Sequence, residues 1–221
     1  MKKEIKIVVP TDYSAVPLKK YLQIQDDLER YKDDKEAQDA FLLFNLIGLT
    51  PDIINKLDSE TIGKIKGDLH KFLNRTDFDL EKFVTIDGKE YGFEPNLSKM
   101  AYGAYLDLSS FETLSIDKNW KKIMNILYRP VTKKQGALYS IESYNSEKLG
   151  DEDKWLDVPM DVHFGCFFFF NRIYKELLKD ILKSSREEAL ADPEVNPHIK
   201  RILQESGEVI NQLLSSQEKI S

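Results

Sequence analysis

The chain is poor in two features that would narrow its class. Cys166 is the only cysteine among 221 residues, so no intramolecular disulfide bond can form, which suits a reducing compartment. Long apolar runs are also missing. The longest, Val162–Phe170, contains His163 and ends at Asn171–Arg172. A membrane-spanning helix needs roughly 18–20 apolar residues, so we expect no membrane insertion.

Recognisable catalytic motifs are missing as well. Gly63–Gly67 contains glycines and lysines, but it lacks the Gly-x-x-x-x-Gly-Lys-Ser/Thr pattern of a phosphate loop and falls inside a predicted helix. Neither a Gly-x-Ser-x-Gly elbow nor a His-Glu-x-x-His motif occurs. The pairs Asp26–Asp27 and Asp33–Asp34 point to different helix faces, which disfavours paired-carboxylate catalysis. We therefore assign no catalytic residue, cofactor or metal ligand.

The charge balance limits the kind of partner. The chain has a net charge of -6 and an isoelectric point near 5.3. An acidic surface repels phosphate backbones, so general nucleic-acid binding is disfavoured. Hydrophobic residues make up 41% and charged residues 32%, a composition typical of a folded domain rather than a disordered chain.

The first third of the chain is predicted to form short helices. Apolar residues recur at helical spacing in residues 17–33, 35–48, 51–57 and 60–75. We expect Gly48 to cap the second helix at its C-terminus and Ser59 to cap the fourth at its N-terminus. Before them, alternation of Lys and Glu with Ile and Val predicts a short strand at residues 3–9, ended by Pro10.

Strand patterns appear in the middle of the chain. Residues 83–86 and 89–93 flank Asp87–Gly88, a strong signal for a two-residue hairpin turn. The remaining predicted elements are helices at 97–111, 117–130, 159–191 and 198–217 and a strand within 136–144. The fold class expected is mostly helical α+β, with several short helices, one small antiparallel sheet or hairpin and a long central C-terminal helix. Prolines in Asp192–Pro197 predict a domain over residues 1–192 and an appended amphipathic helix over 193–221.

Arg129 and an aromatic pair in the middle of the chain are candidates for structural or binding roles. Arg129 stands just before Pro130 at the end of a predicted helix, and we expect its charge to stabilise that helix C-terminus. Tyr102 and Tyr105 form an aromatic pair that either packs on the hairpin or binds a partner. We favour packing in the core for this pair.

The segment Pro159–Phe170, with the sequence PMDVHFGCFFFF, carries the densest group of reactive and aromatic residues. His163 and Cys166 lie three residues apart, so on a helix they share a face and could hold zinc or form a nucleophile pair. The other histidines, His70 and His198, lie in separate predicted helices. Because aromatic residues surround the whole helix at this point, we interpret the segment, including Phe167–Phe170, as a buried hub of the fold or of an interface.

Four stretches, in this order, carry a family resemblance: IKIVVPTDYSAVPLKKYLQIQ, GKEYGFEPNLSKMAYGAYLDLSSF, NWKKIMNILYRPVTKKQGALYSIESYN and PMDVHFGCFFFFNRIYKELLKDIL. Together they resemble proteins from the structural-gene blocks of tailed bacteriophages, such as tail assembly chaperones and small virion proteins of crAss-like phages. The resemblance covers roughly residues 1–182. GKEYGFEPNLS, YGAYLDL and KIMNILYRPV are its most specific elements.

The resemblance implies a non-enzymatic role in virion morphogenesis. A tail assembly chaperone coats the helical tape-measure protein, so the implied partners are other phage structural proteins, with a homo-oligomer as a further option. The implied location is the cytoplasm of the bacterial host during assembly, or the virion. Alternatives are a structural or internal virion component (a neck, ring or ejected protein) and an uncharacterised enzyme, which the His163–Cys166 pair would motivate.

Two amphipathic helices are the candidate partner-binding elements in this interpretation. Amphipathic helices can bind other helices through apolar grooves, although both also suit ordinary packing on their own domain. The candidate residues are Leu18, Tyr21, Leu22, Leu28, Ile202, Leu203, Ile210 and Leu214.

Overall fold

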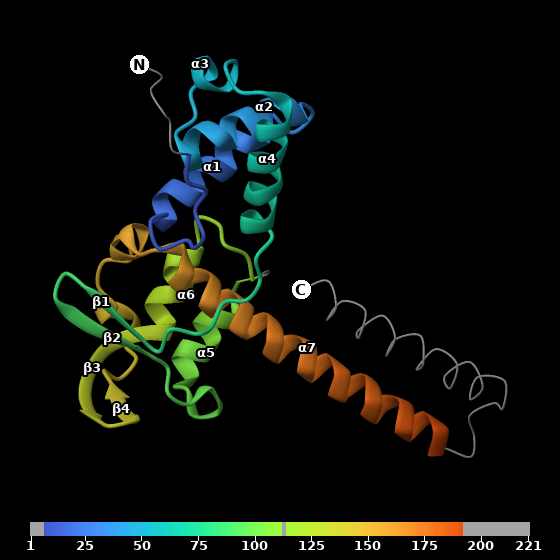
Figure 1. The fold of residues 1–221 in the computed structure, drawn as a ribbon. Coiled ribbons are helices and arrows are strands. Elements are labelled where there is room, and N and C mark those ends of the chain that lie inside the picture. Colours follow the sequence, from blue (N-terminus) through green and yellow to red (C-terminus); the bar gives the residue numbers. More distant parts are fainter. Residues whose placement is uncertain (1–6, 112–113, 192–221) are drawn as a thin grey trace. The chain divides into compact units, whose positions relative to one another are not determined.

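A computed structural model describes residues 7–111 and 114–191 (Figure 1). Over these ranges the chain forms seven α-helices and one four-stranded antiparallel sheet, which confirms the α+β class. The chain divides into two compact units, Met1–Phe167 and Phe168–Ser221. The domain boundary predicted near residue 192 stays a prediction, because residues 192–221 lie outside the described residues. The predicted helix over residues 198–217 lies outside the described residues.

Short helices build the first part of the larger unit, as predicted. They are α1 (Leu18–Arg30), α2 (Lys35–Leu42), a π-helical turn at Leu43–Ile47, α3 (Pro51–Ile54) and α4 (Ser59–Leu73). Gly48 ends the π-turn with φ 78°, which confirms its capping role. The N-cap of α4 is Asp58, whose carboxylate accepts a hydrogen bond from the Thr61 backbone, and not Ser59 as predicted. The side chains of Asp39 in α2 and Lys66 in α4 form an ion pair at 2.9 Å.

The sheet has the order β1-β2-β3-β4, with strands Phe83–Ile86, Lys89–Phe93, Tyr128–Gln135 and Leu138–Ile141. Asp87 and Gly88 have φ 51° and 76°, as a two-residue hairpin turn requires, so the predicted hairpin is confirmed. The helix expected to end near Pro130 ends at Leu127, and β3 follows without a loop. The strand predicted over residues 3–9 is absent at Ile7–Val9, and residues 3–6 lie outside the described residues.

The remaining helices are α5 (Tyr102–Ser109), α6 (Trp120–Leu127) and α7 (Met160–Ala191). A 3-10 helix, η4, spans Asp153–Asp157. The core of the larger unit gathers where α6, η4 and the first turns of α7 meet. Its fully buried apolar side chains include Trp120, Met124, Leu127, Trp155 and Met160.

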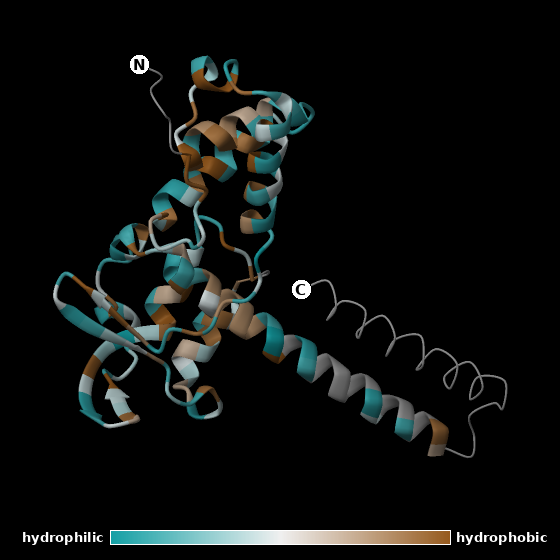
Figure 2. Cartoon of the chain, viewed as in Figure 1, coloured by the Kyte–Doolittle hydropathy of each residue, from teal (hydrophilic) through white to brown (hydrophobic). Residues whose placement is uncertain are grey.

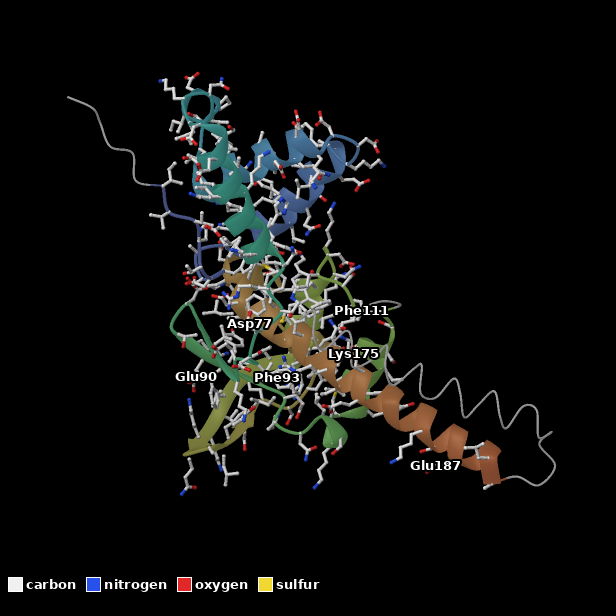
Figure 3. The ribbon with its side chains drawn as sticks, turned by 45° about the vertical axis from the view of Figure 1, so that its right-hand side comes forward. Asp77, Glu90, Phe93, Phe111, Lys175 and Glu187 are labelled. Carbon is white, nitrogen blue, oxygen red and sulfur yellow. The ribbon has the colours of Figure 1, made fainter. Side chains whose placement is uncertain are left out.

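Two close backbone approaches fix the start of α7. The Met160 amide donates to the Val16 carbonyl at 2.9 Å, so the segment before α1 is bound to the segment that opens α7. Inside α7, Gly165 lies against the segment before β1. A Cβ atom on Gly165 would stand 2.2 Å from the Asp79 carbonyl oxygen, so only glycine fits there. Phe93, labelled in Figure 3, is buried at the end of β2.

Candidate functional site

His163 lies in the core and both of its ring nitrogens have protein partners. The Trp120 indole N–H donates to His163 Nδ1 at 3.1 Å, so Nδ1 is the acceptor. The proton is therefore on Nε2, which donates to the Trp155 carbonyl oxygen at 3.2 Å. Burial lowers the pKa of His163 to about 4, while hydrogen bonds to backbone carbonyls act in the opposite direction. His163 is therefore a neutral connector that joins α6, η4 and α7.

Cys166 is fully buried one turn further along α7. Burial raises the pKa of its thiol, which disfavours the reactive thiolate. In this conformation a substrate can reach neither Cys166 nor His163. Among the residues that the structure describes, no group of three or more His, Cys, Asp or Glu side chains is placed to hold a metal ion.

The phenylalanine run is less buried than predicted. Phe167, Phe168, Phe169 and Phe170 are each half-buried, whereas His163, Gly165 and Cys166 are buried. The interpretation as a buried hub of the fold therefore holds for His163, Gly165 and Cys166, and for the half-buried rings the alternative of an interface stays open. Phe167 contacts Trp120 edge to face, with ring centroids 6.0 Å apart.

Arg129 has the structural role that was predicted. Its guanidinium donates to the Ile126 carbonyl in the last turn of α6 at 3.1 Å and to the Glu142 carbonyl at 2.8 Å. It also forms a buried ion pair with Glu94 at 2.5 Å. The Glu94 amide in turn donates to the Leu127 carbonyl at 2.8 Å. Arg129 thus caps α6 and joins it to the sheet.

Helix α5 presents three of its larger side chains to solvent. Tyr102, Tyr105 and Leu106 are 73%, 58% and 46% exposed, and we call these three residues the α5 face. Positions i, i+3 and i+4 share one side of a helix, so the three side chains form a single ridge. The two tyrosine rings lie nearly parallel, with an interplanar angle of 23° and centroids 6.3 Å apart. The prediction that this aromatic pair packs in the core is wrong.

The opposite side of α5 holds the helix in this orientation. Ala104 is fully buried, and α5 packs against α6. The Tyr144 ring lies against Gly103, where a Cβ atom would be 3.3 Å from the ring. The Tyr144 hydroxyl donates to the Asp107 carboxylate. Gly103, Ala104 and the Tyr144 clamp therefore attach α5 to its neighbours. Leu108 is half-buried, and the side chains of the α5 face stay exposed.

The α5 face is mainly apolar and can bury apolar area against another surface. Asp107 is the only charged residue of α5, and white and brown dominate this helix in Figure 2. Phe111, labelled in Figure 3, follows the helix and is half-buried. Binding surfaces are enriched in tyrosine and depleted in charge at their centres. The composition of α5 therefore favours a protein-binding surface.

The residues predicted to bind a partner are placed differently. In α1, Leu18 is fully buried, while Tyr21, Leu22 and Leu28 are half-buried. Tyr21 packs edge to face on Phe164 with centroids 5.5 Å apart. Partner binding by α1 stays a prediction, and Leu18 offers it no surface in this conformation. Ile202, Leu203, Ile210 and Leu214 lie outside the described residues.

A helix that crosses a membrane must be both long and apolar. Within residues 7–111 and 114–191, no helix combines the length and the apolar character that crossing a bilayer requires.

Comparison with known proteins adds no relative. No protein-family model matches the chain. No curated protein and no solved structure matches it significantly.

Proposed function

We propose that the protein is a non-enzymatic binding protein of tailed-phage assembly, similar in role to a tail assembly chaperone, which holds a helical segment of another phage protein. The α5 face is the observation that supports this most directly. A surface helix normally buries its large apolar side chains, and α5 exposes three of its four, with only Leu108 half-buried. The four stretches that resemble phage structural-block proteins supply the biological setting, and two of them contain α5 and its clamp residue Tyr144.

The partner in this proposal is the tape-measure protein, and the place of action is the cytoplasm of the bacterial host. Apolar stripes on a long helix aggregate unless another surface covers them. The α5 face offers such a cover, and the net charge of -6 keeps a complex soluble.

Co-expression tests this function. The tape-measure protein of the same phage is produced with the wild-type chain, with Leu106→Ser and with Leu138→Ser. Leu138 is 78% exposed in β4 and lies outside the α5 face, so it is the matched control. We expect wild type and Leu138→Ser to keep the tape-measure protein soluble and Leu106→Ser to lose this effect. The proposal is contradicted if the tape-measure protein is equally soluble with all three chains, or if it stays insoluble with all three.

Mass spectrometry of purified virions separates a chaperone from a virion component. A chaperone is absent from mature particles, whereas a neck, ring or ejected protein is present in fixed copy number. Detection of the chain at many copies per particle contradicts the chaperone role and favours the virion component.

A further inference from the structure

Strand β1 (Phe83–Ile86) forms one edge of the sheet, and the outer side of this strand has unused hydrogen-bonding groups. β1 pairs with β2 alone, and Ile86 lies opposite Lys89 across the two-residue turn. Bonded positions alternate in an antiparallel pair, so the N–H and C=O groups of Phe83 and Thr85 point away from β2. Among the described residues, no hydrogen bond joins these four groups to another segment. The edge can therefore accept a further strand.

The β1 edge lacks the features that usually protect the edge of a sheet. Natural edge strands often carry a lysine, a proline or a β-bulge that prevents further pairing. β1 has the sequence FVTI, with no charge and no proline, and it pairs with β2 without a register shift. All four residue types favour strands, and Thr85 is exposed. β1 is thus well suited to pair with a further strand.

The charge around the two edges of the sheet differs. Residues 79–87, which contain β1, carry three carboxylates and one lysine, a net charge of -2, and Asp79, Glu81 and Asp87 are exposed. Residues 133–141, which contain β4, carry two lysines and no carboxylate. A basic strand is therefore attracted to the β1 edge and repelled from the β4 edge.

The chain itself contains a basic segment with a strand pattern, at residues 3–9. Together with Lys2, this segment carries three lysines and one glutamate, a net charge of +2 that complements the β1 edge. Its apolar residues at positions 5, 7 and 9 would share one face of a strand. Paired with β1, they would extend the sheet face on which Val84 is buried. Within one copy, Ile7–Val9 form no strand.

The position of Thr11 disfavours pairing within one copy. The Arg75 guanidinium donates to the Thr11 carbonyl, which holds this part of the chain beside the residue that follows α4. Residues 76–82 contain no helix. A strand that ran back from Thr11 along them would place position 9 beside residue 77 and position 5 beside residue 81, before β1 begins. A second copy is free of this restriction.

We propose that residues 3–9 of one copy add to the β1 edge of a second copy as a fifth, antiparallel strand, and that two copies exchange these segments reciprocally. The backbone groups of Phe83 and Thr85 then bond to the added strand, and the carboxylates around β1 attract its lysines. The α5 face takes no part in this contact, so the inference stands or fails independently of the proposed function.

Analytical ultracentrifugation of the full-length chain from about 1 μM to 1 mM tests the inference. Wild type should form dimers as the concentration rises, and added salt should weaken them because it screens exposed charges. Thr85→Pro removes an outward N–H and leaves the pairing with β2 intact, so it should weaken dimerisation about tenfold or more. Thr85→Val keeps the N–H and should dimerise like wild type. Thermal melts check that both variants fold.

A second pair of variants tests the segment without changing the sheet. Ile7→Asp and Val8→Asp change the charge equally, but the two positions lie on opposite faces of a strand. Ile7→Asp should weaken dimerisation more than Val8→Asp, because position 7 lies on the face that would become buried. Hydrogen exchange gives an independent measure, since the Thr85 amide of wild type should exchange more slowly as the chain concentration rises.

Four results would overturn the inference. They are a monomer throughout the concentration range, a dimer that Thr85→Pro leaves unchanged, equal effects of Ile7→Asp and Val8→Asp, and protection of the Thr85 amide that does not depend on concentration. The last result would show that a segment of the same copy covers the β1 edge.

Discussion

Acidification should destabilise the fold through His163. The ring is buried and neutral, with a pKa of about 4 against an ordinary value of 6.5. Folding therefore favours the neutral ring, so its stabilising contribution is complete above a pH of about 6.5 and is lost as the pH falls towards 4. Protonation also places an N–H on Nδ1, facing the Trp120 N–H that now donates to it.

The size of the effect follows from the two pKa values. Their difference corresponds to about 3 kcal/mol once protonation is complete, and to about 2 kcal/mol at a pH near 5. Asp58 and Asp77 have pKa values lowered from 3.8, so they keep their charge throughout this range. The part of the loss that His163 causes is the part that is absent when His163 is replaced by a residue that does not titrate.

Urea unfolding at a series of pH values measures this. Wild type should lose about 2 kcal/mol of unfolding free energy between a pH of about 8 and 5, with a slope approaching one proton. His163→Gln, whose amide does not titrate, should be less stable at pH near 8 and nearly flat over the range. A flat wild-type profile, or an equal slope in the variant, would refute the reasoning.

Three further predictions concern the same core. Gly165→Ala should lower the free energy of unfolding by about 3 kcal/mol or more in a thermal or urea melt, because the new Cβ would overlap the Asp79 carbonyl oxygen. The control Gly67→Ala, which has open space in α4, should be neutral or stabilising. Equal effects of the two substitutions would refute the close approach at Gly165. Cys166 should react with a thiol reagent only after denaturation, and fast labelling of the native chain would show that the thiol is accessible. Arg129→Met should lower the free energy of unfolding by about 3–5 kcal/mol, because it leaves the Glu94 carboxylate buried without its cation. Adding Glu94→Gln in a double-mutant cycle should recover part of this loss. If the double variant recovers no stability, the ion pair is contradicted.

Short sequence patterns predicted the turns and caps that depend only on neighbouring residues. Gly48 ends its helix because a left-handed residue is needed there, and Asp87–Gly88 turn the hairpin for the same reason. Arg129 was predicted from its place beside a helix end and does cap α6. The cap of α4 was misplaced by one residue, because Asp58 and Ser59 are both good N-cap residues and the sequence does not distinguish them.

Long-range pairing explains the failures in the sheet. The helical pattern of residues 120–127 continues into Tyr128 without a turn residue, so nothing local marks the start of β3. The strand exists because Tyr128–Pro130 pair with β2. Conversely, Ile7–Val9 have a strand pattern but no strand partner in the structure, and pattern alone does not create a sheet.

The α5 face could not be predicted because a stripe of apolar side chains looks the same whether it faces inward or outward. Its orientation depends on Tyr144, which lies more than thirty residues away and clamps Gly103 and Asp107. The small residues Gly103 and Ala104 were the available signal, since a close helix approach requires them. Similarly, the four phenylalanines gave no sign that His163 and Cys166, rather than the rings, lie deepest.

Site-specific photocrosslinking tests the central claim most directly. A photoreactive residue replaces Tyr105 in one variant and the exposed control Leu138 in another, and each is expressed with the tape-measure protein before illumination. The account predicts a crosslink to the tape-measure protein from position 105 and none from position 138, with the attached peptide lying in an apolar stripe. Crosslinks only from position 138, or only between copies of this chain, would contradict it.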